Sequence, residues 1–98
     1  MSANSTCSKD TGWSVYIIQA SDCRLYTGIT NNMARRWQQH QEKKGAKFFR
    51  GRSPIALCYQ EPDHNRSSAS QREYAIKQMS RCEKLQLIAQ TYGPFVVN

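Results

Sequence analysis

The first regular pattern in the chain is a pair of apolar and aromatic runs separated by turn residues. Residues 13–19 (WSVYIIQ) and 24–29 (RLYTGI) are rich in β-branched and aromatic side chains, which is typical of strands. Residues 20–23 (ASDC) favour a turn. We therefore expect the two runs to form an antiparallel hairpin.

The pairing of these strands decides where two tyrosines lie. If Ile18 pairs with Arg24, Tyr16 lies directly opposite Tyr26, and directly opposed residues share a face of the sheet. A register shifted by two residues would keep both tyrosines on that face but offset them. Gly28 costs stability within a strand, and it indicates the close approach of another backbone or of a ligand.

A helix is predicted directly after the hairpin, over residues 32–42. Met33 and Trp37 stand at i and i+4 and form a short apolar stripe. Arg36 and His40 have the same spacing on the neighbouring stripe. Because so few residues separate this helix from the second strand, it must fold back onto or beside the sheet.

One more strand and two more helices follow. Residues 55–60 (IALCYQ) are typical of a strand, and residues 61–66 (EPDHNR) of a turn. A helix is expected over residues 67–79, and Ser80 and Glu83 have the spacing of a capping box that starts another. The order β-β-α-β-α-α predicts an α+β fold, a small three-stranded, mainly antiparallel sheet flanked by helices.

The length of 98 residues fits one domain, which we place at residues 12–92. Residues 1–11 are polar and lack an apolar period, so we expect a disordered tail, and residues 93–98 are expected to be a short C-terminal tail. A domain of this size holds one core and no deep enclosed pocket. We therefore expect any active site to be a surface groove.

The four cysteines show neither a C-x-x-C motif nor a Cys/His ligand pair, so a zinc site is not expected. No apolar signal segment opens the chain, and no apolar run approaches the roughly 18 residues of a membrane span. We therefore expect a cytoplasmic protein with free thiols and no membrane partner.

Charge favours a polyanionic partner. The chain has 14 Lys and Arg against 7 Asp and Glu, a net charge of +7, which favours nucleic acid over an anionic membrane surface. Residues 43–52 are basic and contain Phe48 and Phe49, a combination that suits phosphate contacts and base stacking. A solvated loop anchored by the two phenylalanines is the alternative. The candidate nucleic-acid contacts are Lys43, Lys44, Lys47, Arg50 and Arg52.

A few side chains can carry chemistry. Two tyrosines in a hairpin usually indicate packing alone. The planar fork of Arg36 suits a phosphate, and His40 suits proton transfer or a phosphate hydrogen bond, although both also fit a solvated helix face. Glu73 falls on the apolar stripe of its helix, where a charge needs a partner or a metal. Alternatively, Ser70 and Glu73 form the capping box of a helix that starts later.

Five pieces of the sequence occur in one order: Val15-Tyr16-Ile17, Tyr26-Thr27-Gly28, Arg36, His40 and Glu73. In this order and spacing they resemble the GIY-YIG nuclease superfamily. The segments LYTGITN, RRWQQH and REYAIK resemble its small stand-alone bacterial subfamily of YhbQ-like proteins.

The resemblance implies hydrolysis of a phosphodiester with one divalent ion, Mg²⁺ or Mn²⁺. By this match Glu73 would bind the metal, Tyr16 would be the general base for the attacking water, and Tyr26 would help to orient the water or phosphate. Arg36 would stabilise charge on the phosphate oxygens, with His40 in a supporting position. A free tyrosine has a pKa near ~10, so Tyr16 would need help from the metal and Arg36.

The activity that the resemblance favours is that of a metal-dependent endonuclease acting on DNA, in DNA repair or processing. The change from Gly-Ile-Tyr to Ser14-Val-Tyr is mild. Two departures weigh on the activity: Ile29 stands where many relatives carry a lysine, and the asparagine that some relatives use well beyond the glutamate has no convincing counterpart. The alternative is a nucleic-acid-binding module, or a nuclease-like subunit of a larger complex that does not cleave on its own. In that case protein partners would supply the specificity.

Overall fold

The structure is a computed structural model that describes residues 12–42, 44 and 46–92. The expected tails, residues 1–11 and 93–98, lie outside the described residues. The observed order of strands and helices confirms the α+β prediction. The elements are β1 (Trp13–Ala20), β2 (Leu25–Thr30), α2 (Met33–Gln41), the 3-10 turn η1 (Lys47–Phe49), β3 (Pro54–His64), α3 (Arg66–Lys77) and α4 (Arg81–Tyr92).

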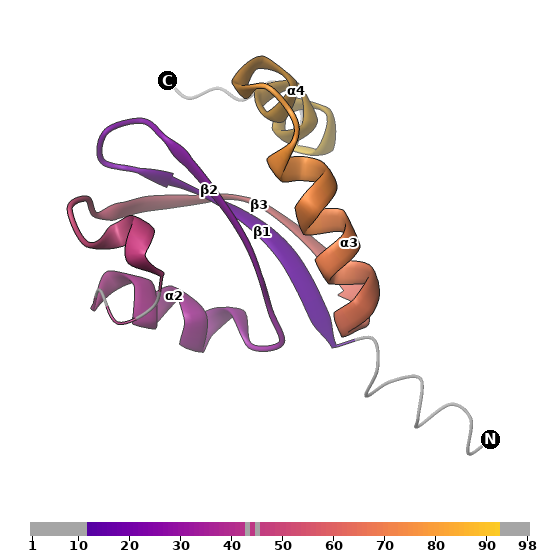
Figure 1. The fold of residues 1–98 in the computed structure, drawn as a ribbon, viewed down its shortest axis with the longest axis horizontal. Helices are drawn as coiled ribbons and strands as arrows, with labels where there is room; N and C mark the ends of the chain where they lie inside the picture. Colours follow the sequence, from indigo (N-terminus) through magenta and orange to yellow (C-terminus); the bar gives the residue numbers. More distant parts are fainter. Residues whose placement is uncertain (1–11, 43, 45, 93–98) are drawn as a thin grey trace.

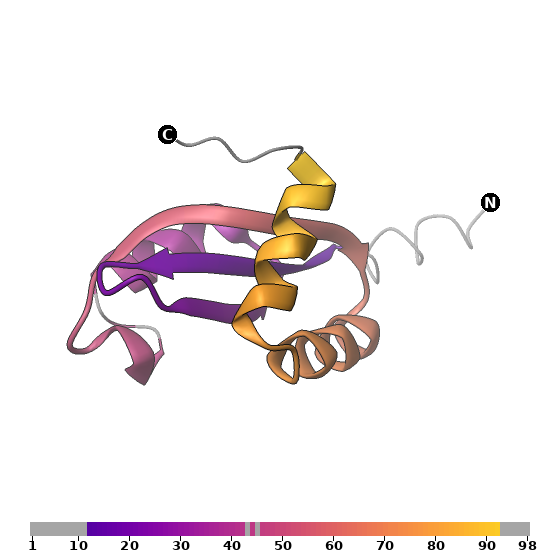
Figure 2. The ribbon, with the colours of Figure 1, turned by 90° about the horizontal axis from the view of Figure 1, so that it is seen from above.

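The three strands form one antiparallel sheet in the order β2-β1-β3. Helix α2 lies on one side of the strands and α3 and α4 on the other (Figure 1). Figure 2 shows α4 running across the strands. Because side chains alternate along a strand, β1 supplies both cores. Val15 and Ile17 face α3 and α4, whereas Tyr16 and Ile18 face α2 and η1.

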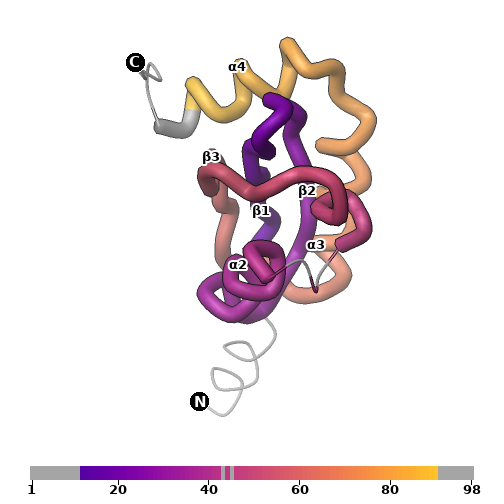
Figure 3. Tube along the Cα trace, turned by 90° about the vertical axis from the view of Figure 1, so that its left-hand side faces the viewer, coloured from indigo at the N-terminus to yellow at the C-terminus, as the bar shows by residue number. Residues whose placement is uncertain are grey.

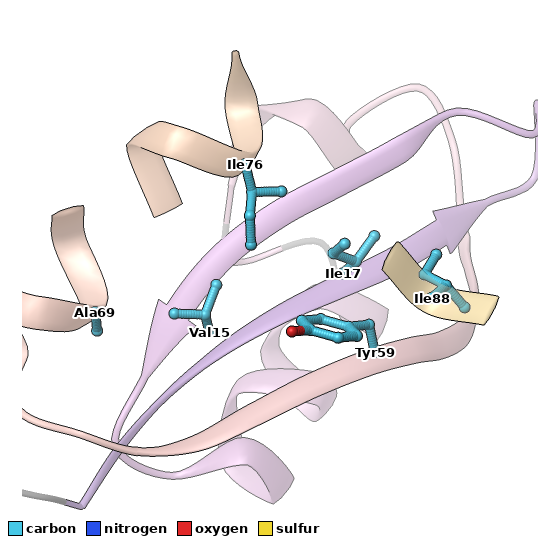
Figure 4. Close-up of a cluster of buried hydrophobic side chains, with 6 residues drawn as sticks. All are labelled: Val15, Ile17, Tyr59, Ala69, Ile76 and Ile88. Carbon is cyan, nitrogen blue, oxygen red and sulfur yellow. The ribbon is translucent and has the colours of Figure 1, made fainter. Parts of the chain in front are cut away.

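The core beneath α3 and α4 is a cluster of hydrophobic side chains from β1, β3 and both helices (Figure 4). Burying one valine or isoleucine side chain stabilises a fold by about 1.5–3 kcal/mol. This core therefore holds α3 against the sheet and fixes the position of Glu73 on that helix. Its members are Val15, Ile17, Tyr59, Ala69, Ile76 and Ile88.

The predicted register of the hairpin is wrong by two residues. Tyr16 pairs with Gly28, and Ile18 pairs with Tyr26. The cause is the turn: the backbone N–H of Ala20 donates to the carbonyl of Arg24, and Cys23 adopts a positive φ of 71°. A type I turn followed by a left-handed residue closes a hairpin with a three-residue loop. Both tyrosines remain on one face, as a two-residue shift requires.

The predicted turn over residues 61–66 is wrong for residues 61–64, which continue β3 as far as His64. Pro62 cannot donate to a ladder, but β3 is an edge strand, where proline is tolerated. The pairing with β1 shifts between Trp13 and Val15, and Asp63 has a φ of 68°. An irregularity of this kind lets a strand continue past a residue that cannot pair.

Local capping sets the start of both C-terminal helices. Asn65 caps α3 and forms a capping box with Ser68. The alternative capping box between Ser70 and Glu73 is therefore wrong, since Glu73 lies inside α3. The predicted box at the start of α4 is confirmed, because Ser80 and Glu83 exchange hydrogen bonds of 2.8 and 3.2 Å.

A polar network joins the end of β3 to α3. The carboxylate of Glu61 accepts from Arg72 Nε at 3.1 Å and lies 2.7 Å from His64 Nε2. His64 Nδ1 lies 2.8 Å from the hydroxyl of Ser68. Burial alone would raise the pKa of Glu61, but the bonds from Tyr59, His64 and Arg72 together lower it. These bonds fix the angle at which α3 leaves the sheet.

Within the described part of the chain, every helix is too short or too polar to cross a bilayer.

Candidate active site

The side chain of Tyr16 crosses β2 above Gly28. A Cβ atom at position 28 would lie 2.5 Å from the Tyr16 hydroxyl oxygen, 2.7 Å from its Cζ and 3.0 Å from Cε2 of Tyr26. Real Cβ atoms do not approach other atoms so closely, so only glycine fits here. The close approach at Gly28 is therefore made by the side chain of Tyr16, and not by the backbone or ligand that was expected.

Helix α2 supplies two side chains to this phenol. Its start is fixed by Asn32, whose side chain accepts from the backbone N–H of Arg35 at 3.1 Å. One turn apart on α2, Arg36 Nε donates to the Tyr16 hydroxyl oxygen at 3.4 Å, and His40 Nε2 lies 2.8 Å from that oxygen. The predicted pair of α2 residues thus converges on one of the two predicted tyrosines.

Hydrogen-bond accounting indicates the direction of the Tyr16–His40 bond. Both side chains are fully buried, and His40 Nδ1 has no partner among the described residues. If Tyr16 donates to Nε2, only the Nδ1 proton lacks a partner. If Nε2 donates instead, both Nδ1 and the Tyr16 proton lack one, and each buried unpaired group costs about 1–3 kcal/mol. We infer a chain in which Arg36 donates to Tyr16 and Tyr16 donates to His40.

Burial keeps both partners of this bond neutral at pH 7. It raises the pKa of Tyr16 to about 12, against the hydrogen bond from Arg36, while Tyr26 and Glu73 add smaller upward effects. Burial, followed by the charge of Arg36, lowers the pKa of His40 to about 4. For Arg36, burial lowers the pKa, but the hydroxyls of Tyr16 and Tyr26 together outweigh burial and raise it. The positive charge of the group therefore resides on Arg36.

The stability of the protein is expected to fall on acidification because of His40. Its pKa is about 4 when folded against an ordinary 6.5, so the unfolded chain binds the proton more readily. The stabilisation that depends on neutral His40 is complete above pH 6.5. It is lost as the pH falls towards 4, by roughly 3 kcal/mol at most. Urea unfolding at pH 7.5 and 4.5 should show a smaller pH-dependent loss in His40→Gln than in the unaltered protein. Equal losses would contradict the assignment.

An aromatic cluster encloses the Tyr16–His40 pair. The His40 ring lies 4.8 Å from that of Phe49 and 5.3 Å from that of Tyr26, measured between centroids, and Phe48 packs against Tyr26 at 5.2 Å. Phe49 is fully buried, so it cannot stack on a base. The alternative in which phenylalanines anchor the basic loop is therefore the one that the packing favours.

The predicted nucleic-acid contacts fall into two groups. Arg52 is engaged within the fold: it donates to Asp22 and to the Phe48 carbonyl, both at 2.8 Å, and lies over the Phe48 ring. Lys47 and Arg50 are exposed, and Lys44 is exposed beside Glu42, 3.7 Å away. Lys43 lies outside the described residues. Contact of these side chains with nucleic acid stays a prediction.

Glu73 stands apart from the group on α2. It lies on α3, where its carboxylate pairs with Lys77 at 3.2 Å. Among the described residues it makes no hydrogen bond to either tyrosine, although its charge is close enough to raise the pKa of Tyr16. The structure thus brings Tyr16, Tyr26, Arg36 and His40 into contact, and Glu73 acts on Tyr16 through its charge.

Gln39 is a site residue that the sequence pattern did not single out. Its side-chain oxygen accepts from Arg36 Nη1 at 3.0 Å, which fixes the guanidinium from the side opposite Tyr16. The i, i+3 spacing places Arg36 and Gln39 side by side on the helix, and this spacing could have identified Gln39 from the sequence. Both residues line an open pocket between the end of β2 and α2, together with Trp13, Ile29, Thr30, Asn31, Asn32 and Arg35.

Known proteins resemble this chain over most of its length. A family model described as the GIY-YIG catalytic domain matches residues 12–86. The UPF0213 protein DP2720 of Desulfotalea psychrophila is 52% identical over 77 residues, which cover 78% of this chain and 70% of that protein. The UPF0213 protein YhbQ of Escherichia coli O139:H28 is 43% identical over 83 residues, covering 85% of this chain and 83% of that protein.

A solved structure also matches. The solution NMR structure of the UPF0213 protein BH0048 from Bacillus halodurans is 37% identical, with a TM-score of 0.55. The match covers 85% of this chain and 88% of that one. These relatives' names state no substrate or activity. With the family-model match, they show that the chain belongs to the GIY-YIG catalytic domain family, a nuclease family, and to its small UPF0213, YhbQ-like branch.

Proposed function

We propose that this protein is a metal-dependent endonuclease that hydrolyses phosphodiester bonds in DNA. The observation that carries the proposal is the buried chain of hydrogen bonds from Arg36 through Tyr16 to His40. Phenylalanine would pack equally well at this position. Packing therefore does not explain a hydroxyl that lies between a cation and a neutral imidazole. The net charge of +7 supports a polyanionic substrate.

Arg36 is the residue that would hold the phosphate. Its Nε and Nη1 groups already donate to Tyr16 and Gln39, so the guanidinium plane is fixed before substrate binds. Preorganised donors stabilise developing charge without reorganisation during the reaction, and losing one typically costs ~10²–10³ in rate. The open pocket beside Arg36 gives a phosphodiester access to this side chain.

Tyr16 would accept the proton of the attacking water as its own proton passes along the existing hydrogen bond to His40 Nε2. The lone pair that now accepts from Arg36 is the one that would receive the water proton. With a pKa of about 12, Tyr16 is protonated at rest, and added positive charge nearby would favour loss of its proton. His40 fixes the direction of the hydroxyl, and Tyr26 borders the same space through its contact with the Tyr16 ring.

Glu73 would hold the divalent ion, Mg²⁺ or Mn²⁺. Among the described residues there is no group of three or more His, Cys, Asp or Glu side chains able to enclose a metal. A single carboxylate nevertheless fits Mg²⁺, which keeps several waters and often binds through one carboxylate and substrate phosphates. When bound, the ion would supply positive charge to the phosphate and make bound water more acidic. Lys77, now paired with Glu73, would have to release it.

A cleavage assay tests the proposal. Plasmid, single-stranded and branched DNA are incubated with the folded protein in Mg²⁺, in Mn²⁺ and in EDTA. We expect cleavage with either metal and none in EDTA, and a loss of ~10²-fold or more in Glu73→Gln. Line broadening by Mn²⁺ in NMR spectra, centred on Glu73 and absent from Glu73→Gln, would support the metal assignment independently. Folded protein that cuts none of the substrates would rule out the proposed activity.

A nucleic-acid-binding module without cleavage is the second candidate. The raised pKa of Tyr16 and the pairing of Glu73 with Lys77 favour it. This candidate predicts DNA binding that persists in EDTA and is unchanged in Glu73→Gln, with no cleavage under any condition. The same protein preparations and the same DNA substrates distinguish the two candidates.

A further inference from the structure

A basic pocket lies at the end of the molecule that holds the β1–β2 turn, and none of the predicted nucleic-acid contacts belongs to it. Three cations from two distant parts of the chain meet there beside two apolar side chains. The space between them is about 270 Å³, far more than one water molecule needs. The basic pocket is lined by Arg24, Leu25, Phe48, Arg81 and Lys84.

The fold builds this pocket by bringing the start of α4 against the hairpin turn. Figure 3 shows α4 and the turn between β1 and β2 at the same end of the molecule. Arg81 Nη1 donates to the backbone carbonyl of Cys23 at 2.6 Å. Lys84 follows one helical turn later and therefore lies on the same side of α4. The position of Arg81 is thus fixed by the main chain and not by an acidic partner.

The basic pocket retains positive charge. Asp22, in the adjoining turn, pairs with Arg52 at 2.8 Å and only at 3.6 Å with Arg24. In the described part of the chain, Lys84 has no carboxylate partner. The Glu83 carboxylate accepts from the backbone N–H of Ser80. Like charges gathered in one place repel each other unless an anion relieves them.

The edge strand β2 connects the basic pocket to the active site. Leu25, at the start of β2, lines the pocket, and Gly28, three residues further on, lies beneath the Tyr16 phenol. Three strand residues span about 10 Å. Phe48 lines the pocket and packs against Tyr26, so the two places share a wall.

We propose that the basic pocket is a second phosphate subsite, which holds the nucleic-acid backbone beyond the bond at the active site. The subsite rests on the proposed function for its substrate, since the nucleic acid that it holds is the one presented to Tyr16. Arg81 and Lys84 contact phosphate oxygens, and Arg24 adds charge from the turn. The subsite fixes the direction of the strand along β2.

The test is the salt dependence of DNA binding, measured in EDTA so that no cleavage occurs. Fluorescence anisotropy with a labelled duplex gives the slope of log Kobs against log salt for the unaltered protein, Lys84→Gln and Arg81→Gln. Each variant should lower the slope by about 0.9, the value for one lost phosphate contact. Arg66→Gln is the matched control, because Arg66 is exposed and lies over Trp13 at the other end of β1.

The outcomes separate the subsite from the proposed function. Normal binding slopes in both Lys84→Gln and Arg81→Gln, with a native circular dichroism spectrum, would overturn the subsite while leaving cleavage intact. A protein that binds with reduced slopes in the variants but never cuts would support the subsite and overturn the nuclease. The Lys84 side chain makes no hydrogen bond to any residue that the structure describes, so Lys84→Gln stays informative if Arg81→Gln fails to fold. If inorganic phosphate shifts the NMR signals of the pocket amides while the binding slopes of the variants stay unaltered, the pocket binds free anions only. That result would overturn the proposal.

Discussion

Replacing Tyr16 with phenylalanine is expected to lower the rate of phosphodiester cleavage by about 10²–10⁴-fold, the usual effect of a positioned acid–base group. The substitution removes one oxygen and keeps the aromatic ring over Gly28. That oxygen accepts a hydrogen bond from Arg36 and is hydrogen-bonded to His40. Its loss therefore removes the proposed base and releases the two α2 side chains from each other.

Tyr74→Phe is the matched control, because this tyrosine is 68% exposed and loses the same hydroxyl. Its cleavage rate should equal that of the unaltered protein. Tyr16→Phe also leaves His40 Nε2 without its buried partner, at a cost of about 1–3 kcal/mol. Rates should therefore be measured well below the melting temperature, with circular dichroism as a check on folding. Cleavage by Tyr16→Phe at the unaltered rate would remove Tyr16 from the mechanism.

The sequence predicted best those parts of the fold that depend on neighbouring residues. The helix expected at residues 32–42 forms as Met33–Gln41, because Asn32 caps it locally. The capping box from Ser80 to Glu83 has the same short range. Convergence of Arg36 and His40 on one face of the sheet followed from helical spacing and a short connection. Local spacing therefore placed Arg36 and His40 on one helix face, whereas the resemblance to the GIY-YIG family grouped them with Tyr16.

Features that depend on distant contacts were predicted less well. The hairpin register depends on the left-handed conformation of Cys23, which its side chain does not favour and which the turn imposes. The role of Arg52 depends on Asp22, 30 residues away. The contact from Arg81 to the Cys23 carbonyl spans 58 residues and leaves no periodic signal. The structure was needed to place Gly28 opposite Tyr16.

Gly28→Ala is expected to abolish cleavage and to destabilise the protein by about 1–3 kcal/mol or more, as overpacking of a close-packed core does. The new methyl group would lie 2.5 Å from the Tyr16 hydroxyl oxygen and 2.7 Å from Cζ, so the ring would have to move. The Tyr16 ring is rigid and packs against Tyr26 and His40, so it cannot relieve the clash by rotating only the end of a flexible side chain. Movement of the phenol would break its bonds to Arg36 and His40.

Gly51→Ala is the control for Gly28→Ala, because nothing lies within 4 Å of a Cβ at position 51. We expect its melting temperature to stay equal or to rise slightly, since alanine restricts the unfolded chain by about 0.4–1 kcal/mol. A double-mutant cycle identifies the clash. Tyr16→Leu removes Cζ and the hydroxyl, so Gly28→Ala should cost much less in that background than alone. Additive costs would show that the penalty at Gly28 arises from the backbone and not from the phenol of Tyr16.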